Sequence, residues 1–101
     1  NYLSDVKTIN ASNAWTVGGY YDTTMGTART LIQHWDGQDW KIVSSPNANE
    51  YYNDLGTLEV ISPNDIWAAG FYDDGNNGYK NLVMHWNGAD WRLVVGARLW
   101  R

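Results

Sequence analysis

The amino-acid sequence predicts an all-β chain made of two copies of one four-stranded antiparallel unit. The first observation is an internal repeat: the motif His-Trp-Asp-Gly-Gln-Asp-Trp at residues 34–40 returns as His-Trp-Asn-Gly-Ala-Asp-Trp at 85–91. The second is that each copy divides into four short apolar runs bounded by turn-forming residues. The third is that no window carries an apolar period of 3.6 residues long enough for a helix.

The repeat extends over nearly the whole chain, with one residue lost between Gly26 and Arg29. We therefore expect one repeat unit at residues 1–52 and a second at 53–101, while residues 96–101 align with nothing in the first copy and are expected to be a linker or a foreign tail. At an offset of 52, the residues that match are Leu3, Val6, Ile9, Trp15, Gly18 and Tyr20 with Leu55, Leu58, Ile61, Trp67, Gly70 and Tyr72.

In the first copy, the strands are expected at residues 3–10, 14–21, 29–35 and 40–44. Asp36-Gly37 marks the turn between the last two of these strands, because glycine readily takes the positive φ that hairpin turns need. The third and fourth strands should therefore be antiparallel.

In the second copy, the strands are expected at residues 55–62, 66–72, 82–86 and 91–94. Pro63-Asn64-Asp65 and Asn87-Gly88 are turn signals, and the polar, glycine-containing run at 73–78 breaks the chain between the second and third strands. Its acidic and amide side chains could hold calcium, but the matching loop of the first copy lacks this charge, so we expect a solvated loop.

Four short antiparallel strands in a unit of about 50 residues match one blade of a β-propeller. A β-sandwich is the main alternative. It is disfavoured because a sandwich has no reason to repeat its sequence with the period of one four-stranded meander.

The frame Ser/Pro-Asn-Asp-x-Trp-Ala-x-Gly, followed by His-Trp-Asp/Asn-Gly-x-x-Trp, resembles the repeats of bacterial β-propeller proteins. The second copy carries it as Pro63-Asn64-Asp65-Ile66-Trp67, whereas the first has the weaker match Ala11-Ser12-Asn13-Ala14-Trp15. The resemblance implies two propeller blades and an extracellular or cell-surface location. It does not fix a function, because such propellers serve as binding modules and scaffolds of many kinds.

Two blades alone would leave two apolar faces in water, since each propeller blade packs on a neighbour at both faces and propellers hold about 4 to 8 blades. We therefore expect the chain to close a ring by head-to-tail homo-oligomerisation. Three chains would give six blades and four chains eight, and we favour the trimer. The first residue, Asn1 rather than Met, suggests a processed or excised fragment. If the chain is a piece of a longer propeller, the same ring is expected to cover its faces.

The composition narrows the choice of partners. The chain has seven Lys and Arg against eleven Asp and Glu, without a basic cluster, so nucleic acid is not an expected partner. No apolar run reaches the 18 residues that a membrane span needs, and the absence of Cys excludes thiolate metal sites and disulfides.

The candidate ligand-binding residues are Trp40, Trp91, Tyr21 and Tyr72. Flat aromatic rings stack on the apolar faces of sugars, and a Trp pair recurs in each copy; for Trp35 and Trp86 we favour a packing role instead. Carbohydrate is thus a possible partner beside a second copy of the chain.

The Trp-Asp-Gly-x-x-Trp hairpin is also similar to that of small fucose-binding propeller lectins, which assemble from two-blade chains. That family binds sugar through an Arg and a Glu, and the matching positions here hold Thr16 and Ile32 in one copy and Ala68 and Val83 in the other. The fucose chemistry is therefore missing, although another sugar specificity stays open.

Catalysis is not expected. His34 and His85 recur once per copy on strands, which favours a structural hydrogen bond over a single asymmetric catalytic set. No nucleophile motif, phosphate loop, metal site or cofactor site is expected either. The sequence thus predicts a non-catalytic interaction scaffold, with a lectin-like module as the alternative and a hydrolase with Asp22, Asp73 or Asp74 at the ring axis as a distant third.

The recurring Trp15 and Trp67 are expected to be buried between blades, because each is followed by small residues that let a neighbouring sheet approach. On this hypothesis Trp67→Ala costs about 3 to 5 kcal/mol and unfolds the chain.

Overall fold

The computed structural model describes residues 2–24, 26–47, 52–73, 75 and 78–94. Among these the chain forms eight strands in two four-stranded sheets, each in the order of the sequence with every neighbouring pair antiparallel. The all-β prediction and the division into two equivalent four-stranded units are therefore confirmed. The end of the chain expected to be a linker or tail, 96–101, lies outside the described residues.

Sheet 1 contains β1 (Tyr2–Asn10), β2 (Asn13–Asp22), β3 (Thr27–Trp35) and β4 (Trp40–Val43). Sheet 2 contains β5 (Tyr52–Ser62), β6 (Asp65–Asp73), β7 (Tyr79–Trp86) and β8 (Trp91–Leu93). Each predicted strand is present, and the largest differences are at β5 and β7, which both begin three residues earlier than expected.

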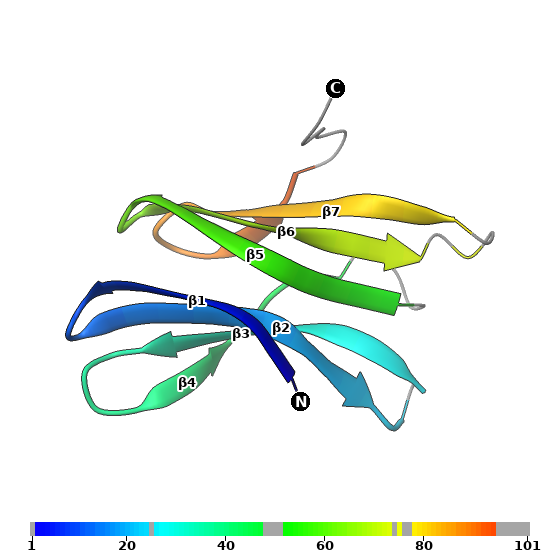
Figure 1. Ribbon diagram of the computed structural model, residues 1–101, viewed down its shortest axis with the longest axis horizontal. Helices are drawn as coiled ribbons and strands as arrows, with labels where there is room; N and C mark the ends of the chain where they lie inside the picture. Colours follow the sequence, from blue (N-terminus) through cyan, green and yellow to red (C-terminus); the bar gives the residue numbers. More distant parts are fainter. Residues whose placement is uncertain (1, 25, 48–51, 74, 76–77, 95–101) are drawn as a thin grey trace.

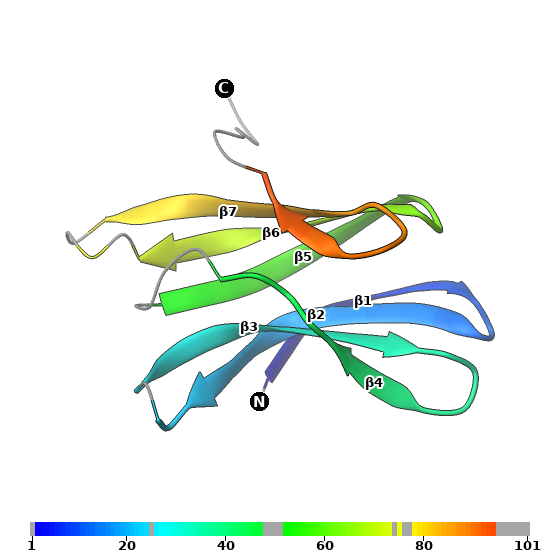
Figure 2. The same cartoon turned by 180° about the vertical axis from the view of Figure 1, so that it is seen from behind.

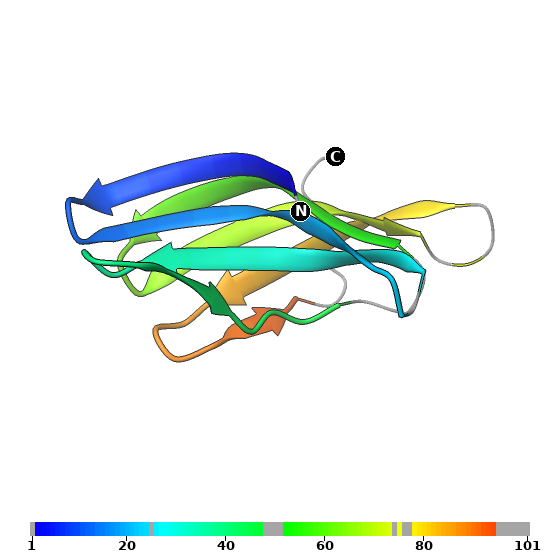
Figure 3. The ribbon, with the colours of Figure 1, turned by 90° about the horizontal axis from the view of Figure 1, so that it is seen from below.

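The two sheets lie face to face, with β1 to β4 forming one layer and β5 to β8 the other (Figure 1; Figure 2). Viewed from below, the strands of the two layers run in similar directions (Figure 3). We call the faces that meet the inner faces and the opposite ones the outer faces. The buried cluster between the inner faces draws on both sheets: Trp15, Val17, Ile32, Leu55, Leu58, Ile66, Ala68, Leu82, Met84 and Trp91.

Both sheets bulge at the same step of the repeat. The register between the first two strands shifts after Leu3 in sheet 1 and after Leu55 in sheet 2. Opposite these bulges stand Gly18 and Gly70, where an added Cβ would lie 2.8 Å from the Cα of Leu3 or Leu55. The repeated glycine is thus required by a close approach of two backbones.

The hairpins at the ends of the sheets also have the same construction. Trp35 pairs with Trp40 across a four-residue loop, 36–39, in which Asp36 Oδ1 accepts hydrogen bonds from the backbone N–H groups of Gln38 and Asp39, both at 2.9 Å. Asn87 Oδ1 does the same in sheet 2, at 2.9 and 3.0 Å. This loop therefore requires an Asp or Asn at its first position, followed by a glycine that adopts a positive φ.

Candidate functional site

Alternation along the strands gives each sheet two different faces. Trp15 pairs with His34 in sheet 1, and their equivalents Trp67 and His85 pair in sheet 2. The next residue on the third strand points to the other face, where Trp35 pairs with Trp40 and, in sheet 2, Trp86 pairs with Trp91. One face of every sheet thus carries a Trp–His pair and the other a Trp–Trp pair.

The sheets stack so that the Trp–His face of sheet 1 meets the Trp–Trp face of sheet 2. Trp15 is 3% exposed, and its ring centroid lies 5.0 Å from that of Trp86 and 5.6 Å from that of Trp91. The outer face of sheet 1 is consequently a Trp–Trp face, and the outer face of sheet 2 is a Trp–His face.

Equivalent tryptophans therefore have different surroundings. The prediction of burial between sheets is confirmed for Trp15. The Trp67 side chain is 37% exposed on the outer face of the single chain, and its burial against a further blade stays a prediction. The physical reason for the exposure is that the described residues form two sheets, and neither of them covers this face. The expected loss of stability on truncation accordingly belongs to Trp15.

The candidate ligand-binding residues do not form one site. Trp40 is 44% exposed, but Trp91 is 5% exposed in the core and presents no open ring face to a ligand. Tyr21 pairs with Ala28 at the far end of sheet 1 from the Trp35–Trp40 hairpin. Tyr72 is only partly exposed and packs against the core cluster.

Trp40 and Trp35 line a pocket of about 240 Å³ on the outer face of sheet 1. Thr8, Asn10 and Ala11 come from β1 and the turn after it, and Ala14 comes from β2. The Trp35 Nε1–H group donates a hydrogen bond to the Ala11 carbonyl at 3.0 Å, which fixes one wall. The sequence favours a packing role for Trp35 and gives no sign of Thr8 or Asn10, because only strand pairing brings these residues beside the hairpin.

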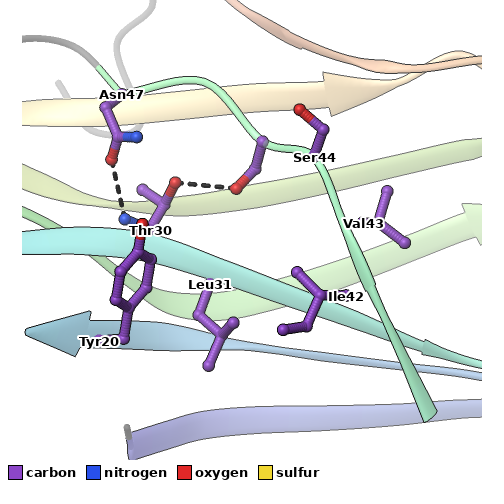
Figure 4. Close-up of a pocket in the computed structure, with 8 residues that line it drawn as sticks. Tyr20, Thr30, Leu31, Ile42, Val43, Ser44 and Asn47 are labelled. Carbon is purple, nitrogen blue, oxygen red and sulfur yellow. Dashed lines mark hydrogen bonds between the residues drawn. The ribbon is translucent and has the colours of Figure 1, made fainter. Parts of the chain in front are cut away.

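A larger pocket, of about 330 Å³, lies where the chain leaves β4 (Figure 4). Thr30 anchors the departing segment: its N–H donates to Asn47 Oδ1 at 2.8 Å, its hydroxyl donates to the Pro46 carbonyl at 3.0 Å, and its oxygen lies 2.8 Å from Ser45 Oγ. These polar groups satisfy one another. The remaining wall is largely apolar, formed by Tyr20, Leu31, Ile42 and Val43, so this pocket offers little specific chemistry.

The repeated histidines make structural hydrogen bonds, as predicted. His34 Nε2 lies 2.7 Å from Asn13 Oδ1, and His85 Nε2 lies 2.7 Å from Asp65 Oδ1. Each bond ties the third strand to the start of the second. Burial lowers the pKa of His34, and the nearby Asp36 carboxylate opposes this shift only in part.

Within the described ranges, no three His, Cys, Asp or Glu residues gather closely enough to hold a metal ion. Most of the polar loop considered for calcium, Asp74, Asn76 and Asn77, lies outside those ranges. Among the residues described, none belongs to a helix long and apolar enough to cross a membrane.

Comparison with known protein families, with curated proteins and with solved structures finds no match to this chain.

Proposed function

We propose that this chain is a non-catalytic β-propeller repeat module whose two sheets are consecutive blades and which closes its ring by homo-oligomerisation. Its role is then that of an interaction scaffold. Three chains and six blades are the ring size we favour. The proposed location is extracellular or at the cell surface, as for the bacterial propellers whose repeats the sequence resembles.

One observation carries the proposal: each outer face repeats the residues of the inner face on the opposite sheet. The outer Trp–Trp face of sheet 1 matches the buried Trp–Trp face of sheet 2, and the outer Trp–His face of sheet 2 matches the buried Trp–His face of sheet 1. A second copy can therefore stack on either outer face by the contact that joins the sheets inside the chain.

The apolar character of the outer faces supports the same conclusion. Large exposed apolar side chains that cluster on one face usually mark an interface. Pairing and alternation place eight of them on the outer faces: Leu3, Val6, Trp40 and Ile42 on sheet 1, and Ile61, Trp67, Phe71 and Tyr79 on sheet 2.

The symmetry of such an assembly follows from the two faces being different. A contact between unlike faces is heterologous, and repeated heterologous contacts give a closed ring or an open fibre. The blade geometry of propellers favours closure.

Sedimentation equilibrium and native mass spectrometry at micromolar concentration test this proposal. We expect one discrete species containing three chains. A folded chain that stays at 11.5 kDa throughout would refute the assembly, and a continuous ladder of oligomers would refute ring closure.

Carbohydrate binding is the second candidate, and the exposed Trp40 ring favours it. A sugar could stack on this ring while the polar side chains of Thr8 and Asn10 provide hydrogen bonds at the edge of the pocket. A glycan array probed in parallel with the parent chain and with Trp40→Ala tests this function. Signal for the parent that Trp40→Ala lacks would support it, and no glycan bound at high protein concentration would remove it.

A further inference from the structure

The contact inside the chain consists of one inserted tryptophan and a pair that receives it. Trp15 enters from sheet 1, with interplanar angles of 55° to Trp86 and 80° to Trp91. The receiving pair has ring centroids 5.8 Å apart at 42°. Ile66 belongs to the same buried cluster, and Val60 packs against this cluster. A tryptophan on one sheet therefore fills a recess beside the Trp–Trp pair of the next.

A second inserting residue is already in place on the outer face of sheet 2. Trp67 lies 4.5 Å from His85 with an interplanar angle of 44°, and Trp15 lies 4.3 Å from His34 at 43°. In both sheets the histidine is held by a 2.7 Å hydrogen bond to the start of the second strand. Trp67 thus has the packing geometry of Trp15 against its own sheet, although its ring is 37% exposed on the outer face.

A second receiving pair is also in place, on the outer face of sheet 1. Trp35 and Trp40 have ring centroids 5.7 Å apart at 47°, which reproduces the geometry of Trp86 and Trp91. The pocket beside them is bounded by Ala14, where sheet 2 has the larger Ile66. The smaller side chain leaves open space beside the Trp35–Trp40 pair, in a pocket of about 240 Å³.

We infer that Trp67 of one chain inserts beside Trp35 and Trp40 of a second copy and anchors a head-to-tail interface. The inference rests on the proposed assembly and names the residues that hold it together. Because both halves are preorganised, association orders few side chains and loses little conformational entropy. Each copy then gives one tryptophan and receives one, so the contact has a direction.

The same inference assigns Trp40 to the interface. Its exposed ring is the receiving wall for an indole of the same chain type, and a sugar would compete with the second copy for this pocket. The carbohydrate alternative and the inserted Trp67 therefore predict opposite effects of assembly on the accessibility of Trp40.

Complementation between two variants tests the direction of the contact. Trp67→Ala lacks the inserting residue and keeps the pocket, whereas Trp40→Ala lacks a wall of the pocket and keeps Trp67. Each alone should associate roughly 30-fold or more weakly than the parent, as expected for a buried interface tryptophan. An equal mixture should form a dimer of one copy of each, because one intact contact remains, and the double variant should add to neither.

Two further variants serve as controls. Thr8→Arg blocks the pocket from an exposed position on β1 and should complement Trp67→Ala as Trp40→Ala does, even if Trp40→Ala folds poorly. Tyr21→Ala removes an exposed aromatic ring far from the pocket and should assemble like the parent. Far-UV circular dichroism checks that each variant is folded.

The outcomes separate this inference from the proposed function. If Trp67→Ala and Trp40→Ala both assemble as strongly as the parent, the inserted tryptophan is refuted, while the proposed ring is not. Loss of assembly in both variants without a mixed dimer would overturn the proposed contact of Trp67 with the Trp35–Trp40 pocket. A monomeric parent would overturn the proposed assembly itself.

Discussion

Trp15 and Trp67 occupy the same step of the repeat, pair with equivalent histidines and pack on them at nearly the same distance, yet one is buried and the other is partly exposed. The local structure of each copy is therefore the same, and only the neighbouring sheet differs. Trp91 and Trp40 show the complementary case, with the buried residue now in sheet 2. Burial in this chain depends on the position of a sheet in the stack.

The largest expected difference between the two copies is in stability. Trp15→Ala removes a side chain from the centre of the core and should lower the free energy of unfolding by about 3 to 5 kcal/mol. Trp67→Ala should cost about 1 kcal/mol in a chain that does not assemble, near the average for single substitutions, because its ring is 37% exposed. Urea unfolding in a Thr8→Arg background measures both losses of stability without a contribution from association. Equal losses for Trp15→Ala and Trp67→Ala would contradict the difference in burial between the two copies.

The two copies should lose similar stability when alanine replaces the glycine that lies close to the neighbouring strand's backbone. Gly18→Ala and Gly70→Ala each place a Cβ against the backbone of the neighbouring strand, and each should destabilise by about 1 to 3 kcal/mol. Gly56→Ala is the control, because the nearest atom to its added Cβ, the Ala69 carbonyl oxygen, lies 3.9 Å away. Thermal unfolding of the three variants checks this, and a harmless Gly70→Ala would show that sheet 2 relaxes where sheet 1 does not.

A smaller loss of stability, similar in the two copies, is expected for substitutions in the hairpin loops. Gly37 and Gly88 have φ values of 100° and 97°, so alanine at either position is strained and should cost about 1 to 2 kcal/mol. Asparagine should cost less than alanine, because it tolerates positive φ better. Chemical denaturation of the four variants measures this, and an alanine variant as stable as its asparagine counterpart would argue against backbone strain.

The smallest expected effect is on pH dependence. Because burial lowers the folded-state pKa of His34, the unfolded chain, with an ordinary histidine pKa of about 6.5, binds the proton more readily. The His34 contribution to stability is therefore complete above about pH 6.5 and is lost as the pH falls through the lower folded pKa.

Asn13→Asp sharpens this test by giving His34 the carboxylate partner that His85 has in Asp65. We expect the substitution to raise the pKa of His34, since a nearby negative charge favours the protonated ring. Histidine C–H chemical shifts followed by NMR during a pH titration measure the change. An unchanged or lower pKa would show that the new carboxylate does not favour the protonated ring.

Much of the fold could be predicted from the sequence because its signals are local. Asp36-Gly37 and Asn87-Gly88 mark hairpins through their own backbone preferences, and the alternating apolar residues around Val17 and Ala69 mark strands. The ends of β5 and β7 were harder to place, because polar residues such as Asn53 and Lys80 belong to strands only by pairing with their neighbours.

The candidate site was less predictable. The repeat makes Trp40 and Trp91 look equivalent, as it does Trp15 and Trp67, and sequence alone gives no reason to choose between the members of either pair. Thr8, Asn10 and Ala14 join Trp35 and Trp40 only because β1, β2 and β3 pair in a particular register.

By itself, the sequence determined that the chain is all β, that it consists of two equal units and where most strands and turns lie, because backbone preference and side-chain alternation act over a few residues. Only the tertiary structure decided which face of each sheet is covered. That choice depends on how one sheet stacks on the other, and it is the reason that Trp15 lies in a core while Trp67 and the Trp35–Trp40 pocket remain open on opposite sides of the same chain.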